Sequence, residues 1–432
     1  MLHRAVLSIT ASALWLAAPA YAQDETASPE PADPNVAAAN AALDAAPVFD
    51  GHNDVPIQIR ARFDNQLADF DFTDTTGTAD AKTGRGAMHT DLNRLKIGKV
   101  GAQFWSVYVP FRLPEPEAVQ MTIEQIDITK RMIAKYPDDL SLSLTADQVE
   151  TAMAEGRIAS LIGMEGGHSI GSSLAVLRQM YALGARYMTL THNANTPWAD
   201  SATDDPEHGG LTDFGRDVVR EMNRIGMLVD LSHVSEETML DALEVATAPV
   251  IFSHSGARAI NGHARNVPDS VLAKLPENGG LVMVVALPGF INEKEREWFA
   301  ARSAEEARLK ALYRGQPGIV EAGVSEWDEA NPTPKAMISH MADHIDHIKS
   351  IAGIEAIGIG ADFDGMPTGP VGFEDTAGYP ALFAELARRG YSQVEMELIS
   401  SRNAIRVMRD AERVATNLRG QPVVETILPA AE

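Results

Sequence analysis

The stretch Ile158-Ala-Ser-Leu-Ile-Gly-Met-Glu165-Gly-Gly-His168 joins an apolar, strand-like run to a single carboxylate flanked by glycines. Four other short pieces also place a metal-binding or proton-handling side chain just after apolar residues. They are His52-Asn53-Asp54 after residues 47–49, His233 after 228–229, His254 after 250–252, and Asp362 after 357–360. A parallel barrel brings the carboxyl ends of distant strands to one face, where its catalytic groups lie. Together the five pieces predict one site, in a hydrolase with two metal ions.

Strand-like runs alternate with helical patterns along the chain, which is typical of βα units on a parallel sheet. The expected strands lie near Val48 and at residues 103–109, 158–163, 187–190, 228–231, 250–252, 281–286 and 356–359. The helical patterns between them include residues 123–135, 172–183, 213–225, 236–246 and 337–351. Eight strands close a (β/α)8 barrel. We therefore predict an α/β protein with a TIM barrel of the metal-dependent hydrolase type.

Two stretches are longer than ordinary βα loops. Residues 64–90 follow the first predicted strand, and residues 288–334 follow the seventh. Both would emerge at the carboxyl face of the barrel, where long loops usually carry function and could cover the site. Alternatively, the two insertions lie on the surface and have no role at the site.

The first residues have the pattern of a secretory signal peptide. His3 and Arg4 precede an apolar stretch over residues 5–18, which ends in the small residues Ala20-Tyr21-Ala22. The apolar run is shorter than the roughly 20 residues that a membrane-spanning helix requires. The predicted organisation is a signal peptide at 1–22, a flexible leader and short helix at 23–45, a (β/α)8 domain at 46–415 and a C-terminal tail at 416–432.

Composition narrows the function further. The net charge is −24, which disfavours nucleic acid and anionic membranes as partners. The chain has no cysteine, so it forms no disulfide and carries no lipid on an N-terminal cysteine. Zinc ligands can then only be His, Asp and Glu. An export signal without disulfides or an anchor is typical of a bacterial periplasmic or secreted enzyme.

The first two candidate pieces contain side chains suited to holding cations. His52 and Asp54 are two residues apart, so at a strand end both point to the same side. Taken alone, such a pair is more often a local hydrogen bond than a metal site. Glu165 has two oxygens and can bridge two cations, although a turn carboxylate that caps a helix has the same sequence pattern.

The remaining pieces add imidazoles and an acid. His233 and His254 close consecutive strands, and two neutral imidazoles are good zinc ligands. A core histidine bonded to backbone is the alternative for either one. Asp362 could take a proton from a water on the metal and pass it to a leaving amine, whereas Asp364 could merely shape the turn.

Longer motifs support a family resemblance that spans residues 49–408. They are DGHND from Asp50, GMEGGHSI from Gly163, LTHNANTPWAD from Leu190, DLSHVS from Asp230, SHSGARAI from Ser253, RNVPD from Arg265, DHIDHIK from Asp343 and ADFDG from Ala361. With these motifs the chain resembles the membrane (renal) dipeptidases, zinc metallopeptidases of the amidohydrolase superfamily (peptidase family M19). The resemblance identifies it as a bacterial member.

The resemblance implies a role for each candidate residue. It assigns His52 and Asp54 to one Zn²⁺ ion, His233 and His254 to a second, and Glu165 to a bridge between the two. It also assigns His192 to the scissile carbonyl or its oxyanion, Arg265 to the substrate carboxylate, and Asp362 to proton transfer. In this scheme a bridging hydroxide attacks the peptide bond of a dipeptide, including dipeptides with a D-residue at the C-terminal position.

The residues leave other activities open. Hydrolysis of a β-lactam, a lactone or an N-acyl amino acid would use the same kind of site, and a catalytically silent barrel could still bind a ligand. The chain also departs from the animal members, because it lacks their cysteines and their hydrophobic C-terminal signal, and its 288–334 insertion is longer. The first two departures argue against a disulfide-linked or tethered assembly and leave a homodimer open. The longer insertion could reshape the substrate pocket, so the family's side-chain preference is not carried over.

Overall fold

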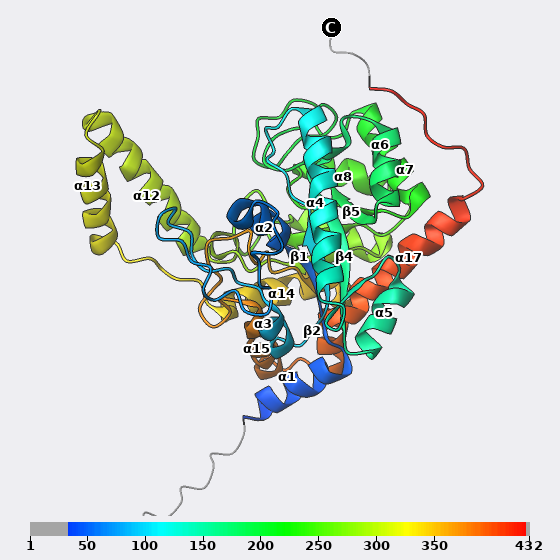
Figure 1. The fold of residues 1–432 in the computed structure, drawn as a ribbon, viewed down its shortest axis with the longest axis horizontal. Coiled ribbons are helices and arrows are strands. Elements are labelled where there is room, and N and C mark those ends of the chain that lie inside the picture. The colour runs from blue at the N-terminus through cyan, green and yellow to red at the C-terminus, as the bar shows by residue number, and fades with distance from the viewer. Residues whose placement is uncertain (1–32, 429–432) are drawn as a thin grey trace, which may run out of the picture. The chain divides into compact units, whose positions relative to one another are not determined.

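Parallel strands form the centre of the computed structural model, which describes residues 33–428 (Figure 1). They are β1 (Val48–Asn53), β2 (Val100–Ser106), β3 (Leu140–Leu142), β4 (Ile158–Glu165), β5 (Ala185–Thr189), β6 (Leu228–Asp230), β7 (Ile251–Ser255), β8 (Leu281–Val284) and β9 (Ile357–Ile359). Their order is β2-β1-β9-β8-β7-β6-β5-β4-β3, and an additional β2–β4 pairing closes the ring. Eight of the strands form the barrel.

The ninth strand, β3, is an addition to the ring. It pairs with residues 158–160 of β4, whereas β5 pairs with residues 162–165 of the same strand. The predicted (β/α)8 barrel is confirmed, but β3 was not predicted. Its three residues, Leu140-Ser141-Leu142, are too few to show a strand pattern in the sequence.

The barrel strands are apolar because both of their faces are covered. Every residue of β2 and β4 is buried, as expected for strands that have side chains inside the barrel and helices outside. Gly163 of β4 is required by this packing, because a Cβ there would overlap the ring of Tyr187 on β5.

Helices surround the ring and connect its strands. They include α1 (Pro34–Ala45), α2 (Val55–Phe63), α3 (Leu92–Ile97), α4 (Glu115–Lys135), α5 (Ala146–Ala154), α6 (Leu174–Ala182), α7 (Asp213–Ile225), α8 (Glu236–Val245), α14 (Ile338–Ala352), α15 (Tyr379–Arg388) and α17 (Asn403–Leu418). Side chains of Ser173, Thr212 and Ser235 cap α6, α7 and α8. The predicted helical patterns thus correspond to α1, α4, α6, α7, α8 and α14.

The two long insertions differ in structure. Residues 64–90 are mostly turns, whereas residues 288–334 form α11 (Pro288–Ile291), α12 (Glu293–Leu312) and α13 (Pro317–Ala330). Helices α12 and α13 make a hairpin with its own small apolar contact among Leu309, Val320 and Val324. Figure 1 shows this hairpin beside the barrel and away from its strands. The two ends of the hairpin are joined by a hydrogen bond from Asn292 Nδ2 to the carbonyl of Pro334.

The chain from Pro34 onward forms one compact unit. The predicted signal peptide at 1–22 lies outside the described residues, and the domain limits at 46 and 415 stay predictions. Helix α17 runs past the second limit, to Leu418. Within residues 33–428, no helix is both long enough and apolar enough to cross a membrane.

Candidate metal centre and substrate pocket

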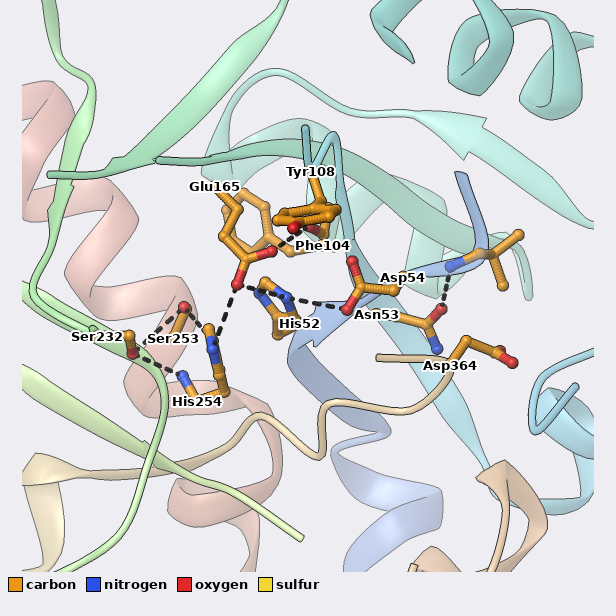
Figure 2. Close-up of polar contacts among 12 residues, drawn as sticks. His52, Asn53, Asp54, Phe104, Tyr108, Glu165, Ser232, Ser253, His254 and Asp364 are labelled. Atoms are coloured by element: carbon orange, nitrogen blue, oxygen red, sulfur yellow. Dashed lines mark hydrogen bonds and ion pairs between the residues drawn. The ribbon is translucent and has the colours of Figure 1, made fainter. Parts of the chain in front are cut away.

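Glu165, the last residue of β4, lies at the centre of a group of four imidazoles. Its Oε1 atom is 3.1 Å from Nε2 of His233, 3.5 Å from Nε2 of His254, and 3.6 Å from Nε2 of both His52 and His192. Figure 2 shows Glu165 between His52 and His254. These side chains come from β1, β4 and β7 and from the loops after β5 and β6, so the barrel brings them together at one end.

The acids predicted from β1 and β9 lie beside this group. Nε2 of His52 is 3.3 Å from Oδ2 of Asp54, and His52, Asp54 and Asp362 form one of three clusters whose ligand atoms could hold a cation. The other two clusters combine Glu165 with His52 and His254, and Glu165 with His192 and His233. Glu165 thus belongs to two of the three clusters, as a bridging ligand would.

Two of these residues have a backbone that few side chains adopt. His233 has φ 71° and Asp362 has φ 69°, both in the left-handed region. The N–H of Asp362 donates to the carbonyl of His52 over 3.3 Å, which holds the end of β9 against the end of β1. The sharp turns after β6 and β9 direct these side chains to the centre of the barrel mouth.

The orientation of His254 is set by a chain of hydrogen bonds. The Ser253 hydroxyl donates to Asp230 Oδ2 over 2.6 Å and lies 2.9 Å from Nδ1 of His254 (Figure 2). Because the single hydroxyl proton goes to Asp230, the hydroxyl accepts a proton from Nδ1. Nε2 of His254 is then unprotonated and faces Glu165 and His233.

His233 and His52 are oriented in a similar way. Nδ1 of His233 lies 3.2 Å from the amide oxygen Oδ1 of Asn193, an acceptor, so Nε2 of His233 is also unprotonated. The Nε2 atoms of His233 and His254 lie 3.0 Å apart. Two lone pairs at this distance repel unless a cation lies close to both. Nδ1 of His52 contacts the Tyr187 hydroxyl at 2.8 Å, and Nε2 of His52 points to the site.

Replacing Ser253 by alanine should weaken metal binding by roughly 10- to 100-fold, the usual effect of losing a partner that orients a ligand. Without the hydroxyl, the Nδ1 proton of His254 has no acceptor and the favoured tautomer is no longer fixed. Competition titration with a chromophoric chelator measures this affinity. The exposed Ser270, whose hydroxyl bonds only to Glu236, provides the control variant S270A; equal affinities for the two variants would contradict the prediction.

Charges in the site agree with a set of cation ligands. Burial holds the pKa of His233 and of His254 well below the usual range, so both rings are neutral. Burial alone would raise the pKa of Glu165, but the His52 ring beside it holds that pKa well below its usual range. Nε2 of His52 and Oδ1 of Asp54 are buried, and within the described part of the chain neither has a hydrogen-bond partner. Nitrogen and carboxylate donors of this kind fit zinc.

Asp362 differs from Glu165 although both are buried. Burial raises the pKa of Asp362 well above its usual range, and the negative charges of Asp54 and Glu165 add to this effect. A carboxyl group that readily keeps its proton is suited to proton transfer.

His192 and Arg265 point to the same space. His192 stacks on His233 with ring centroids 4.1 Å apart, and burial lowers the pKa of His192 to about 4, so its ring is neutral. Arg265 is only 2% exposed. Its Nε and Nη1 atoms have no hydrogen-bond partner among residues 33–428, and burial lowers its pKa to about 10. A buried guanidinium with free donors is suited to binding a carboxylate.

All of the site residues predicted from the sequence, except His52, line one cavity of about 710 Å³. The cavity continues past the candidate metal ligands along α2, residues 84–89 and residues 364–367. Of the two long insertions, 64–90 therefore reaches the cavity. From 288–334 only Phe290 lines it, and no residue of α12 or α13 does.

Sequence reasoning missed the groups that orient the ligands. Tyr187, Asn193, Asp230 and Ser253 hold the imidazoles. The last three lie within the motifs LTHNANTPWAD, DLSHVS and SHSGARAI. Asp230 and Ser253 each lie within three residues of a ligand, which is a usable signal. Tyr187 lies far from any ligand in the sequence and only the register of β5 reveals it.

Comparison with known proteins gives consistent matches over most of the chain. A model of the membrane dipeptidase family, peptidase family M19, matches residues 36–422. The chain is 41% identical over 388 residues to Dipeptidase 3 of Rattus norvegicus, which covers 89% of this chain and 69% of that protein.

Solved structures match as well. The probable dipeptidase PvdM from Pseudomonas aeruginosa superimposes with a TM-score of 0.73 at 23% identity, covering 88% of this chain and 99% of that one. A metallo peptidase from Rhodobacter sphaeroides, solved with a phosphinate mimic of the dipeptide L-Ala-D-Ala, gives a TM-score of 0.68 at 24% identity, covering 85% and 99%. At these identities the two structures support the barrel fold.

Proposed function

The chain belongs to the membrane dipeptidase family, peptidase family M19, and we propose that this metallo-dipeptidase uses two Zn²⁺ ions to hydrolyse the peptide bond of dipeptides. The observation that carries the proposal is the pair of unprotonated imidazole nitrogens, 3.0 Å apart, beside a buried carboxylate. Such an arrangement is costly without cations and favourable with them.

The ligands divide into two sets around Glu165. His52 and Asp54 would hold one ion, His233 and His254 would hold the other, and Glu165 would contribute to both. Zinc bound there would lower the pKa of a shared water molecule, so that hydroxide is available as the nucleophile near neutral pH.

The remaining groups bind the substrate and move the proton. The guanidinium of Arg265 binds the C-terminal carboxylate of the dipeptide, and its burial makes this ion pair strong and selective for short substrates. The neutral His192 ring donates a hydrogen bond to the scissile carbonyl oxygen as negative charge develops there. Asp362 protonates the departing amine. The ligand of the Rhodobacter sphaeroides structure supports the further proposal that dipeptides with a C-terminal D-residue are accepted.

Purified mature protein should hydrolyse L,L- and L,D-dipeptides, lose this activity on chelation and regain it with Zn²⁺. The C-terminal amide of the same dipeptide should be a poor substrate, because Arg265 then has no carboxylate to bind. The N-terminal residue of the sample also tests the proposed export, since removal of residues 1–22 leaves Gln23 first. The proposal would be overturned if the zinc-loaded protein hydrolysed none of the dipeptides. It would also be overturned if the protein hydrolysed a lactam, a lactone or an N-acyl amino acid faster than the dipeptides.

A further inference from the structure

One face of α2 extends the cavity outward from the metal ligands. Asp54 immediately precedes this helix, and Ile57, Gln58, Ala61 and Arg62 also line the cavity. The spacing of three, four, seven and eight residues from Asp54 is that of a single helical face. Since each residue advances an α-helix by about 1.5 Å, the Cα atom of Arg62 lies about 12 Å beyond that of Asp54.

The insertion at 64–90 forms the facing wall of this outer part. Arg85, between Gly84 and Gly86, lines the cavity and donates from Nη1 to the carbonyl of Ala61 on α2 over 2.9 Å. The carbonyl of Arg85 accepts from the N–H of Asp80 over 2.9 Å. The first bond attaches the insertion to the helix on the side where Arg62 lies, and the second holds Arg85 within the insertion.

Neither arginine has an ion-pair partner among residues 33–428, although most arginines of this acidic chain have one. Arg62 donates from Nε to Gln58 Oε1 over 2.7 Å and from Nη1 to the carbonyl of Thr78 over 2.8 Å, both neutral groups. The nearest acids, Asp80 and Asp364, act on Arg62 only at longer range. Arg62 and Arg85 therefore reach the outer cavity without a direct ion pair to any described residue, while Asp364, which also lines this cavity, and Asp80 act on them from farther away.

This outer part lies across the barrel mouth from Arg265. Arg62 follows β1 and Arg265 follows β7, and β9 and β8 lie between these two strands in the ring. In a ring of eight, strands three positions apart are nearly opposite. A dipeptide with its carboxylate on Arg265 and its peptide bond at the metal ligands therefore directs its N-terminal residue toward α2.

We propose that Arg62 and Arg85 form a specificity subsite that selects an anionic side chain, aspartate or glutamate, at the N-terminal residue of the dipeptide. The inference rests on the proposed function, because it assumes a dipeptide at the metal ligands. The dimensions match: an arginine side chain spans about half of the 12 Å between Arg62 and Asp54, and a glutamate side chain spans the remainder. The two guanidinium groups offer several N–H donors in the fork geometry that suits a carboxylate.

The test compares three dipeptides that share a C-terminal residue and begin with Glu, Gln or Lys. With the zinc-loaded wild-type protein, kcat/KM for the Glu substrate should exceed that for the Gln substrate roughly tenfold, the worth of a charge-assisted hydrogen bond, with Lys lowest. The preference for the Glu substrate over the Gln substrate should decrease as the salt concentration is raised. In the double variant R62Q/R85Q it should disappear, whereas hydrolysis of the Gln substrate should continue.

The double variant R314Q/R419Q serves as the control, since Arg314 in the turn between α12 and α13 and Arg419 after α17 are both exposed and their loss changes the net charge by the same two units. Turnover of the Gln substrate by the double variant shows that its site is intact, and R62K should keep part of the Glu preference. Equal rates on Glu and Gln substrates in the wild type, or a preference that persists in R62Q/R85Q, would overturn the inference while leaving the proposed function standing. If the wild type hydrolysed none of the three dipeptides, both the inference and the proposed function would be overturned.

Discussion

Replacing Glu165 by glutamine will abolish dipeptide hydrolysis, with a loss of at least roughly a thousandfold, because several kcal/mol of transition-state stabilisation depend on the bound metal. The substitution keeps the shape of the side chain but removes the negative charge. Oε1 of Glu165 lies within 3.6 Å of four imidazole nitrogens, so its charge acts on both proposed cation sets. A neutral amide offers one weak ligand atom and an NH₂ group that repels cations.

Metal content separates this explanation from a folding defect. The E165Q protein should contain less zinc than the wild type by elemental analysis, while its circular dichroism stays unchanged. The control is E155Q, because Glu155 precedes the same strand at the opposite end of the barrel and is exposed. An E165Q protein that keeps full metal content and activity would refute the bridging role.

Replacing Asp362 by asparagine should lower kcat by roughly 10²- to 10⁴-fold, the usual contribution of a general acid or base. Burial and the nearby charges of Asp54 and Glu165 raise the pKa of Asp362, which favours a carboxyl group that exchanges its proton during the reaction. Asparagine cannot exchange a proton. It does tolerate the left-handed backbone at φ 69°, so the turn after β9 should persist, as it would not with alanine.

Measuring kcat and KM of D362N separately shows which step the substitution affects. KM and zinc content of D362N should stay near the wild-type values, because this residue is proposed to act on the leaving amine rather than to hold zinc or the carboxylate. The exposed Asp127, paired with Arg131 on α4, provides the matched variant D127N. Loss of zinc from D362N would identify Asp362 as a ligand, and an unchanged kcat would remove it from the mechanism.

The fold could be predicted because its signal lies within short segments. A strand buried on both faces, such as β4, is a continuous apolar run, and the eight such runs give the barrel by their number. The candidate ligands at strand ends could be found for the same reason, since His52, Glu165 and His254 each follow an apolar run and the structure brings them together. The family resemblance inferred from the motifs is confirmed by the family model and the relatives.

The remaining parts of the site depend on contacts that no local pattern encodes. His192 and Arg265 lie in loops, where their spacing has no period, and only the resemblance identified them. Tyr187 reaches His52 because β5 and β4 pair in one particular register, with Tyr187 opposite Gly163. A shift of one residue would turn its side chain to the other face of the sheet, so this contact requires the three-dimensional structure.

The hydrogen bond between Asn292 and Pro334 has a consequence for the evolution and engineering of the enzyme. The chain leaves the barrel at Asn292 and returns to it at Pro334, close to the same point. The segment between these two residues can therefore be lengthened, shortened or replaced without moving β8 or β9. The α12–α13 hairpin is thus a suitable insertion site. Its length can differ among related proteins, and a reporter domain or an affinity tag can be inserted there.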